Sequence, residues 1–144
     1  MVYQARTGQR YAFGNAIIEI LGTFDDLAPF YVRADSSNHT SMIFSVTLAG
    51  QKLMSLGDAT SYGLILAAKR YGDYLKSDFL QLSHHGYGDG SSDHSFYEKV
   101  DAPVVLHPGT SLSGSAERWA FDRAKETYSY GIGNVTIELP HTVQ

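Results

Sequence analysis

The 144-residue chain contains no cysteine, and this absence excludes every function that needs a thiol. Disulfides and thiolate metal sites cannot form, so a bound metal ion would have to be held by histidine, aspartate or glutamate. Basic residues are scarce as well: eleven Lys and Arg stand against fifteen Asp and Glu, which gives a formal net charge of −4. A broad basic face that follows nucleic-acid phosphates is therefore not expected.

Long hydrophobic stretches are absent too. No apolar segment reaches the ~18 residues that a helix needs to cross a bilayer, and residues 1–8 contain no apolar signal region. Hydrophobic residues nevertheless make up 43% of the chain and charged residues 18%, which is typical of a chain that folds. We expect residues 1–144 to form a single domain.

A short apolar run in the middle of the chain ends abruptly in histidines and glycines. Phe79–Leu82 is too short for a helix and is predicted to be a buried strand, and Gly86 and Gly88 allow a tight turn after it. His84 and His85 would then project from the carboxyl end of the strand, where ligands bind in α/β sheets. Imidazole is a common metal ligand and proton carrier. The alternative is a pair of solvent-exposed loop histidines.

Hairpins dominate the first half of the chain. Gly14-Asn15 and Ala49–Gln51 are turn sequences that join alternating or apolar runs. In the third predicted strand the buried face is expected to comprise Met42, Phe44, Val46 and Leu48. Polar loops at residues 23–29 and 35–40 flank a brief extended piece at 30–32. The predicted strands are Tyr11–Phe13, Ala16–Leu21, Ser41–Leu48 and Lys52–Leu56.

Helices alternate with strands in the second half. Apolar residues at three- and four-residue spacing predict the first helix, and Gly72 is a suitable carboxyl-terminal cap. The overall pattern predicts an α/β (or α+β) fold, in which helices cover one face of a mixed β-sheet. The predicted elements are a helix from Ser61 or Tyr62 to Tyr71, the strand Phe79–Leu82, a helix His94–Val100 capped by Asp93, a strand Pro103–Leu106, a helix capped by Ser113 or Ser115 that continues to Ala124, and a final hairpin of Tyr128–Tyr130 with Asn134–Leu139.

Polar side chains recur at three predicted strand ends, namely Asp58, His84-His85 and His107. A carboxylate with one or two imidazoles suits zinc, manganese or iron. Asp58 could instead cap the helix that follows it. His107, which precedes Pro108, is interpreted as a loop residue. The other histidines lie in polar stretches and are interpreted as surface residues: His39, His94 and His141.

The order of these motifs resembles the carboxyl-terminal half of the metallo-β-lactamase superfamily. The closest likeness is to the hydrolase domains of bacterial competence (DNA-uptake) proteins, in which an Asn-x-x-Ser strand leads to a Thr-Gly-Asp strand end and then to a His-His-Gly-Ser turn. The resemblance extends from about Gly8 to Leu139 and implies half of an αββα sandwich. The stretches that carry it are Asn38–Phe44, Leu56-Gly57-Asp58 and Ser77–Gly86.

The resemblance also implies roles for individual residues. Asp58 would be the aspartate that bridges two metal ions, and His85 the last metal-ligand histidine. His84 would support these ligands or contact the substrate, and Tyr87, where that branch often has serine, would also face the substrate. Asp58, His85 and His84 are thus the implied catalytic residues. The implied reaction is hydrolysis of an ester, phosphodiester or amide by a metal-bound hydroxide, with zinc, manganese or iron as the cofactor.

One departure from the family is large, because its His-x-His-x-Asp-His motif does not occur in this sequence. We therefore expect the chain to be the second half of a longer enzyme, with an incomplete metal site and no turnover by itself. Its partners would be the missing amino-terminal half and a small-molecule or phosphodiester substrate. An apolar sheet face formed by Val46, Leu48, Leu53 and Ile17 would meet that half and predicts self-association of the isolated chain. The alternative is a non-catalytic binding or scaffolding module that keeps the fold.

Overall fold

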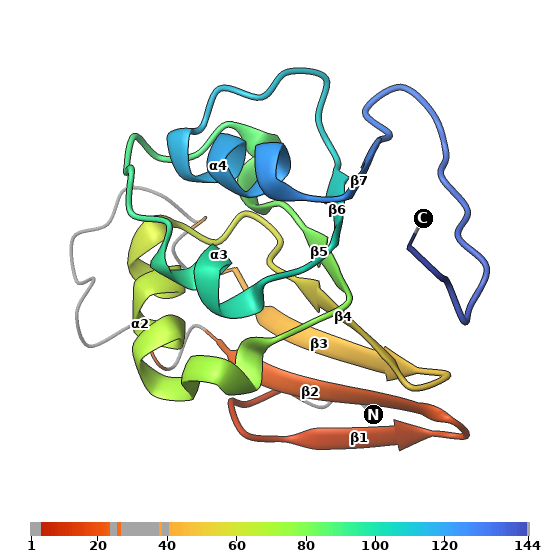
Figure 1. Ribbon diagram of the computed structural model, residues 1–144. Helices are drawn as coiled ribbons and strands as arrows, with labels where there is room; N and C mark the ends of the chain where they lie inside the picture. Colours follow the sequence, from red (N-terminus) through yellow and green to blue (C-terminus); the bar gives the residue numbers. More distant parts are fainter. Residues whose placement is uncertain (1–3, 24–25, 27–37, 39–40, 144) are drawn as a thin grey trace.

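The predicted hairpins form the first four strands of a seven-stranded sheet in which the strands lie in chain order (Figure 1). The computed structural model describes residues 4–23, 26, 38 and 41–143. The predicted loops and extended piece between Thr23 and Ser41, and with them His39, lie largely outside this set. The strands are β1 (Arg10–Phe13), β2 (Ala16–Gly22), β3 (Ile43–Leu48), β4 (Gln51–Ser55), β5 (Phe79–Gln81), β6 (Val104–His107) and β7 (Glu126–Ser129).

Successive strands from β1 through β4 pair antiparallel, and successive strands from β4 through β7 pair parallel. Parallel neighbours need a crossover, and here each crossover contains a helix. The prediction of an α/β fold with a mixed sheet is therefore confirmed. The helices are α2 (Ser61–Tyr71), α3 (Ser95–Val100) and α4 (Ser115–Arg123), and the 3-10 turns are η3 (Gly72–Leu75) and η4 (Ser83–Gly86).

Helices α2, α3 and α4 lie on the same side of the sheet (Figure 1). The hydrophobic core fills the space between them and the sheet, and α2 contributes Leu64, Ala67 and Ala68. Gly72 ends α2 with a φ of 51°, as predicted for its carboxyl-terminal cap. The sheet contributes alternate residues, among them Met54, Leu80 and Val105, which are neighbours in the strand register.

The buried face predicted for β3 is wrong. Ile43 and Ser45 are the fully buried residues of this strand and face the helices, whereas Leu48 is 40% exposed. Because side chains alternate along a strand, Phe44, Val46 and Leu48 lie on the opposite face. Ile17 does not join them, since it pairs with Thr47 and shares the helix side of the sheet.

The final hairpin is also wrong, because residues 134–139 form no strand beside β7. The segment after β7 runs along the sheet face opposite the helices (Figure 1). Gln51 fastens it through hydrogen bonds to the backbone N–H and C=O of His141, and the His141 ring lies against Phe79 at 5.9 Å between centroids. Val135 and Ile137 of this segment line a hollow with Leu106 and Tyr130, whereas Ile132 is 96% exposed.

The helix starts differ slightly from the predictions. His94, not Asp93, is the N-cap residue of α3, although the Asp93 carboxylate accepts a hydrogen bond of 2.9 Å from the Ser95 N–H. Gly114 is the N-cap residue of α4, so neither Ser113 nor Ser115 caps this helix as predicted. Within the described ranges, no helix is long and apolar enough to cross a bilayer.

Burial on the two faces predicts unequal costs for the same truncation. Leu56→Ala should lower the free energy of unfolding by about 2–5 kcal/mol, because Leu56 is fully buried in the core. Leu48→Ala, a matched change on the other face, should cost less than about 1 kcal/mol, since much of that side chain is already in water. Urea denaturation of both variants measures the difference, and equal costs would contradict this assignment of the core.

Candidate active site

Two strand ends that are far apart in sequence meet at one edge of the sheet. Asp58 follows β4, and His85 lies in η4 directly after β5. The Nε2 atom of His85 lies 3.5 Å from Oδ1 of Asp58, and the two side chains are 53% and 37% exposed. Thr60 is the N-cap residue of α2, so the alternative that Asp58 caps this helix is wrong. Asp58 and His85 thus form an accessible carboxylate–imidazole pair.

The backbone of the two turns is tied together beneath this pair. The His84 N–H donates a hydrogen bond of 3.0 Å to the carbonyl oxygen of Gly57. The Asp58 N–H donates to the Ser41 hydroxyl oxygen at 3.3 Å, which links the turn to the residues before β3. The Ser83 hydroxyl donates to the Ala59 carbonyl oxygen. These contacts fix where Asp58 lies relative to the histidines.

His84 is engaged on both ring nitrogens and does not share the environment of His85. Its Nε2 lies 3.1 Å from the Asn38 side-chain amide, and its Nδ1 lies 3.2 Å from the Gly88 carbonyl oxygen. A carbonyl oxygen only accepts, so Nδ1 carries the hydrogen and Nε2 accepts from Asn38. The exposed Tyr87 ring meets the His84 ring edge-on at 6.3 Å. His84 therefore supports the turn, while His85 faces Asp58.

The two histidines have an uncommon backbone conformation. His84 has φ 45° and ψ 45°, and His85 has φ 55° and ψ 18°, which is the left-handed region. A residue other than glycine in this region costs on the order of 1–3 kcal/mol and persists only where its surroundings hold it. The hydrogen bonds described above are part of that support.

Of the other histidines with described positions, His94 and His141 form pairs of their own, and His107 lies behind the turn, where its Nε2 is 3.1 Å from the His85 carbonyl oxygen. His107 is the last residue of β6 and only 5% exposed, so its interpretation as a loop residue is wrong. His141 is not a surface residue either, because its side chain is 20% exposed and pairs with Glu126 at 2.7 Å. His94 stacks on the Trp119 ring at 4.4 Å and also pairs with Glu98.

Asp89 is a supporting residue that the sequence did not reveal. Its carboxylate accepts a hydrogen bond of 2.8 Å from the Ser61 N–H and so satisfies the amino terminus of α2 from a distant loop. Partial burial raises the pKa of Asp89, but hydrogen bonds from Ser61 and Ser91 outweigh it and hold the pKa below its usual value. A cap from a remote loop leaves no local sequence pattern.

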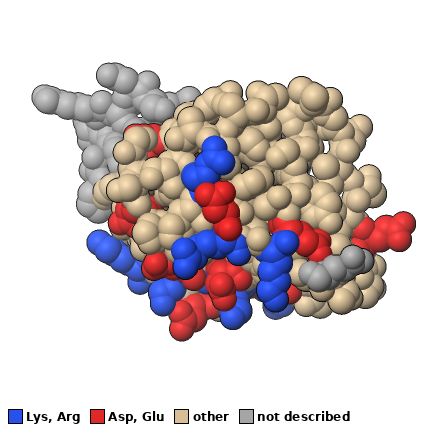
Figure 2. All heavy atoms as spheres, turned by 45° about the horizontal axis from the view of Figure 1, so that its top comes forward, with Lys and Arg blue, Asp and Glu red and all other residues tan. Residues whose placement is uncertain are grey.

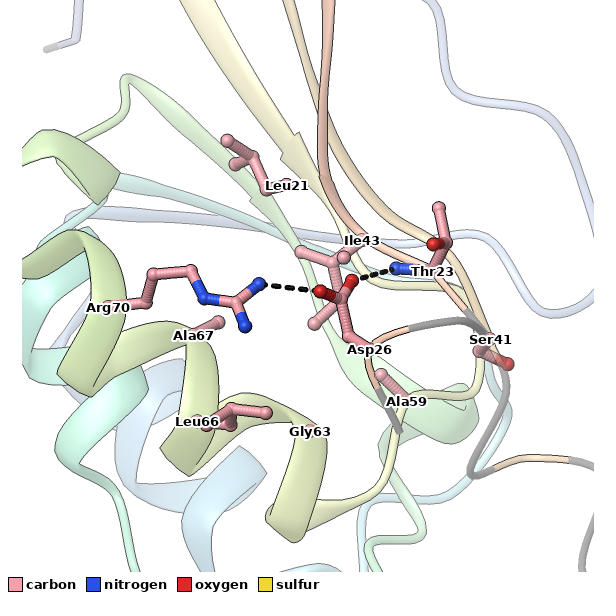
Figure 3. Close-up of a pocket in the computed structure, with 11 residues that line it drawn as sticks. Leu21, Thr23, Asp26, Ser41, Ile43, Ala59, Gly63, Leu66, Ala67 and Arg70 are labelled. Atoms are coloured by element: carbon pink, nitrogen blue, oxygen red, sulfur yellow. Dashed lines mark hydrogen bonds and ion pairs between the residues drawn. The ribbon is translucent and has the colours of Figure 1, made fainter. Parts of the chain in front are cut away.

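A small cavity lies beside the site, between the ends of β2 and β3 and helix α2 (Figure 3). Arg70 and Asp26 face one another across it, with 2.7 Å between Nη1 and Oδ1. Burial raises the pKa of Asp26, but hydrogen bonds from Thr7, Arg70 and the Thr23 backbone together bring it below its usual value. The cavity has a volume of only about 20 Å³, which is room for roughly one water molecule. It is too small for a substrate.

Charged side chains are unevenly spread over the surface. Figure 2 shows Lys, Arg, Asp and Glu gathered toward one side of the molecule, with a largely uncharged area beside them. The loops after β5 and β6, at residues 82–94 and 108–114, contain no Lys or Arg and several serines. These two loops therefore offer hydroxyl and carboxylate groups but no Lys or Arg side chain.

The donor atoms at the site fit part of a metal centre. A carboxylate oxygen and an imidazole nitrogen are ligands for zinc, manganese and iron, and two such ligands leave further positions of the ion to other groups. No set of three or more His, Asp and Glu side chains arranged to hold a metal ion occurs among the residues with described positions. No protein-family model and no curated protein matches the chain. The candidate site thus stands on its geometry.

Close packing behind the turn predicts that replacing Gly86 destabilises the protein more than replacing an unpacked glycine. In Gly86→Ala the new Cβ would lie 2.7 Å from Nε2 of His107 and 2.8 Å from Cδ1 of Leu112, at a φ of 82°. Gly90→Ala is the matched control, because Gly90 has a φ of 86° and no neighbour within 4 Å. Thermal unfolding should show a cost of about 1 kcal/mol for Gly90→Ala and about 1–3 kcal/mol more for Gly86→Ala. Equal costs would mean that the turn is loosely packed.

Proposed function

We propose that this chain supplies one half of the active site of a metal-dependent hydrolase of the metallo-β-lactamase type. With metal bound, Asp58 would supply a carboxylate ligand and His85 an imidazole ligand. The observation that carries the proposal is the meeting of these two side chains at 3.5 Å, accessible to solvent, at the ends of neighbouring parallel strands. That edge of an α/β sheet is where ligands bind.

The chain's own residues divide the work of such a site. Zinc, manganese or iron, when bound, would act as a Lewis acid and lower the pKa of a bound water. Asp58 and His85 hold the ions, and the Ser41 hydroxyl fixes the backbone of Asp58. His84 orients the turn through Asn38 and Gly88, and the His85 imidazole faces Asp58. The exposed Tyr87 lies beside His84, where it can contact a substrate.

The surface around the site supports a small substrate. A long polyanion needs several Lys or Arg side chains to neutralise its phosphates. The loops after β5 and β6 have none. An ester, an amide or a single phosphodiester, whose charge the metal ions can balance, is compatible with this surface.

The sheet face opposite the helices supports a two-part architecture. The carboxyl-terminal segment covers part of this face through His141. Farther along the sheet, Ile18, Val46 and Leu53 follow one another in the strand register and are only partly buried. An amino-terminal half that brings the remaining metal ligands would pack against this row. A non-catalytic module with the same fold is the competing proposal, and metal binding separates the two.

Metal binding gives the direct test of the site. We expect the chain to bind zinc weakly, and Asp58→Ala and His85→Ala to abolish binding, because each removes a ligand. His84→Ala should retain the metal with about 10- to 100-fold lower affinity, since His84 acts through the turn. Isothermal titration of dialysed protein measures this, with Asp93→Ala and His94→Ala as controls that should bind as the wild type does.

Each outcome of the titration decides between the assignments. Loss of zinc in His84→Ala with retention in His85→Ala would reverse the roles of the two histidines. Unchanged binding in Asp58→Ala would contradict the proposed site. No measurable zinc binding by the wild-type chain would favour the non-catalytic module.

The partly exposed row also predicts self-association of the chain. Val46→Glu should shift the protein toward the monomer, because a buried carboxylate in an apolar interface is strongly unfavourable. Thr47→Glu is the matched control, since Thr47 is the next residue of β3 and lies on the opposite face. Analytical ultracentrifugation at high concentration measures both variants against the wild type. A wild-type chain that is strictly monomeric would contradict the prediction.

A further inference from the structure

We propose that His107 is a positioning residue that clamps the His84–His85 turn from behind and so determines where the His85 imidazole points. The inference concerns the backbone of the turn and stands without the proposed function. Only its consequence for metal affinity rests on that function.

The imidazole of His107 joins three parts of the chain. Its Nε2 lies 3.1 Å from the carbonyl oxygen of His85 and 3.2 Å from that of Ser111. Its Nδ1 lies 3.2 Å from the hydroxyl oxygen of Ser129 in β7. Two carbonyl oxygens can only accept, so Nε2 carries a hydrogen and donates it to both of them. The side chain therefore acts as a fixed donor toward the turn.

The turn needs such a partner because its backbone is unusual. His84 and His85 both have positive φ, and left-handed residues other than glycine depend on their surroundings. Neighbouring peptide groups hold the flanks, since His84 N–H donates to Gly57 and the N–H groups of Ser113 and Gly114 donate to the Gly86 carbonyl oxygen. The carbonyl oxygen of His85, in the middle of the turn, is held by the His107 side chain.

The space around the clamp is shaped for this contact. A Cβ on Gly109 would lie 2.1 Å from the carbonyl oxygen of His85, and a Cβ on Gly86 would lie 2.7 Å from Nε2 of His107. Glycine at both positions lets the imidazole reach the turn. Phe121 packs edge-on against the His107 ring, with 6.0 Å between centroids, and limits its rotation. The ring is thus held between α4 and the turn it supports.

A matched pair of variants tests the clamp. In His107→Gln the amide nitrogen reaches about as far as Nε2 and can still donate to His85, whereas in His107→Asn it is one methylene too short. We measure amide hydrogen exchange and the imidazole NMR signals of His84 and His85 in the full chain. His94→Ala is the control for loss of a histidine elsewhere.

The clamp predicts a local response. In His107→Asn the amides of His84 and Tyr87 should exchange about tenfold faster or more, and the His85 imidazole signals should move, while His107→Gln stays close to the wild type. The Leu82 amide, which donates to Leu106 between β5 and β6, should keep its protection in both variants. Equal acceleration of all three amides, or an unchanged turn in the Asn variant, would overturn the proposal.

Zinc titration of the same variants separates the clamp from the proposed function. If both hold, His107→Asn should bind zinc about 10- to 100-fold more weakly than His107→Gln. If the wild type binds no zinc while the exchange result is as expected, the clamp stands and the metal proposal fails. If zinc affinity is equal in the two variants and the turn amides are unchanged, the clamp is refuted while the metal site stands.

Discussion

Parallel pairing of β4, β5 and β6 is the constraint on which the site depends. It places the residues that follow each strand at the same edge of the sheet, so Asp58 and His85 meet although a helix separates them in the chain. The pairing itself depends on the core, because Met54, Leu80 and Val105 are neighbours in register and face the helices together. Packing that keeps these residues aligned also keeps the two side chains of the site within reach of one another.

Local sequence patterns predict the elements better than the way in which they pack. Turn residues located the two hairpins, and three- and four-residue spacing located α2 with its Gly72 cap. The prediction for β3 failed because hydrophobicity favours the side of Phe44, Val46 and Leu48, whereas the helices cover the side of Ile43 and Ser45. The final hairpin failed for a similar reason, since alternating residues that suit a strand also suit a segment lying across the sheet.

The site shows the same division. The positions of Asp58, His84 and His85 at strand ends could be predicted from short motifs, whereas the different roles of the two histidines were implied only by the family resemblance. Two of the partners that create this difference could not, because Asn38 and His107 reach the turn from distant parts of the chain. A buried histidine between an apolar strand and a proline has the same local sequence as an exposed one. The contacts of His107 with His85 and Ser129 arise only when the strands pair, because each partner lies 22 residues away in the chain.

The path of the carboxyl-terminal segment has a consequence for the outer edge of the sheet. Because the segment crosses the face at Gln51 and His141, no described strand pairs with the outer side of β7. An unpaired edge strand offers its peptide groups to any extended chain and is a common starting point of aggregation. At four residues, β7 gives such a chain few hydrogen bonds. The short length of β7, and not a covering strand, therefore limits aggregation through this edge of the sheet.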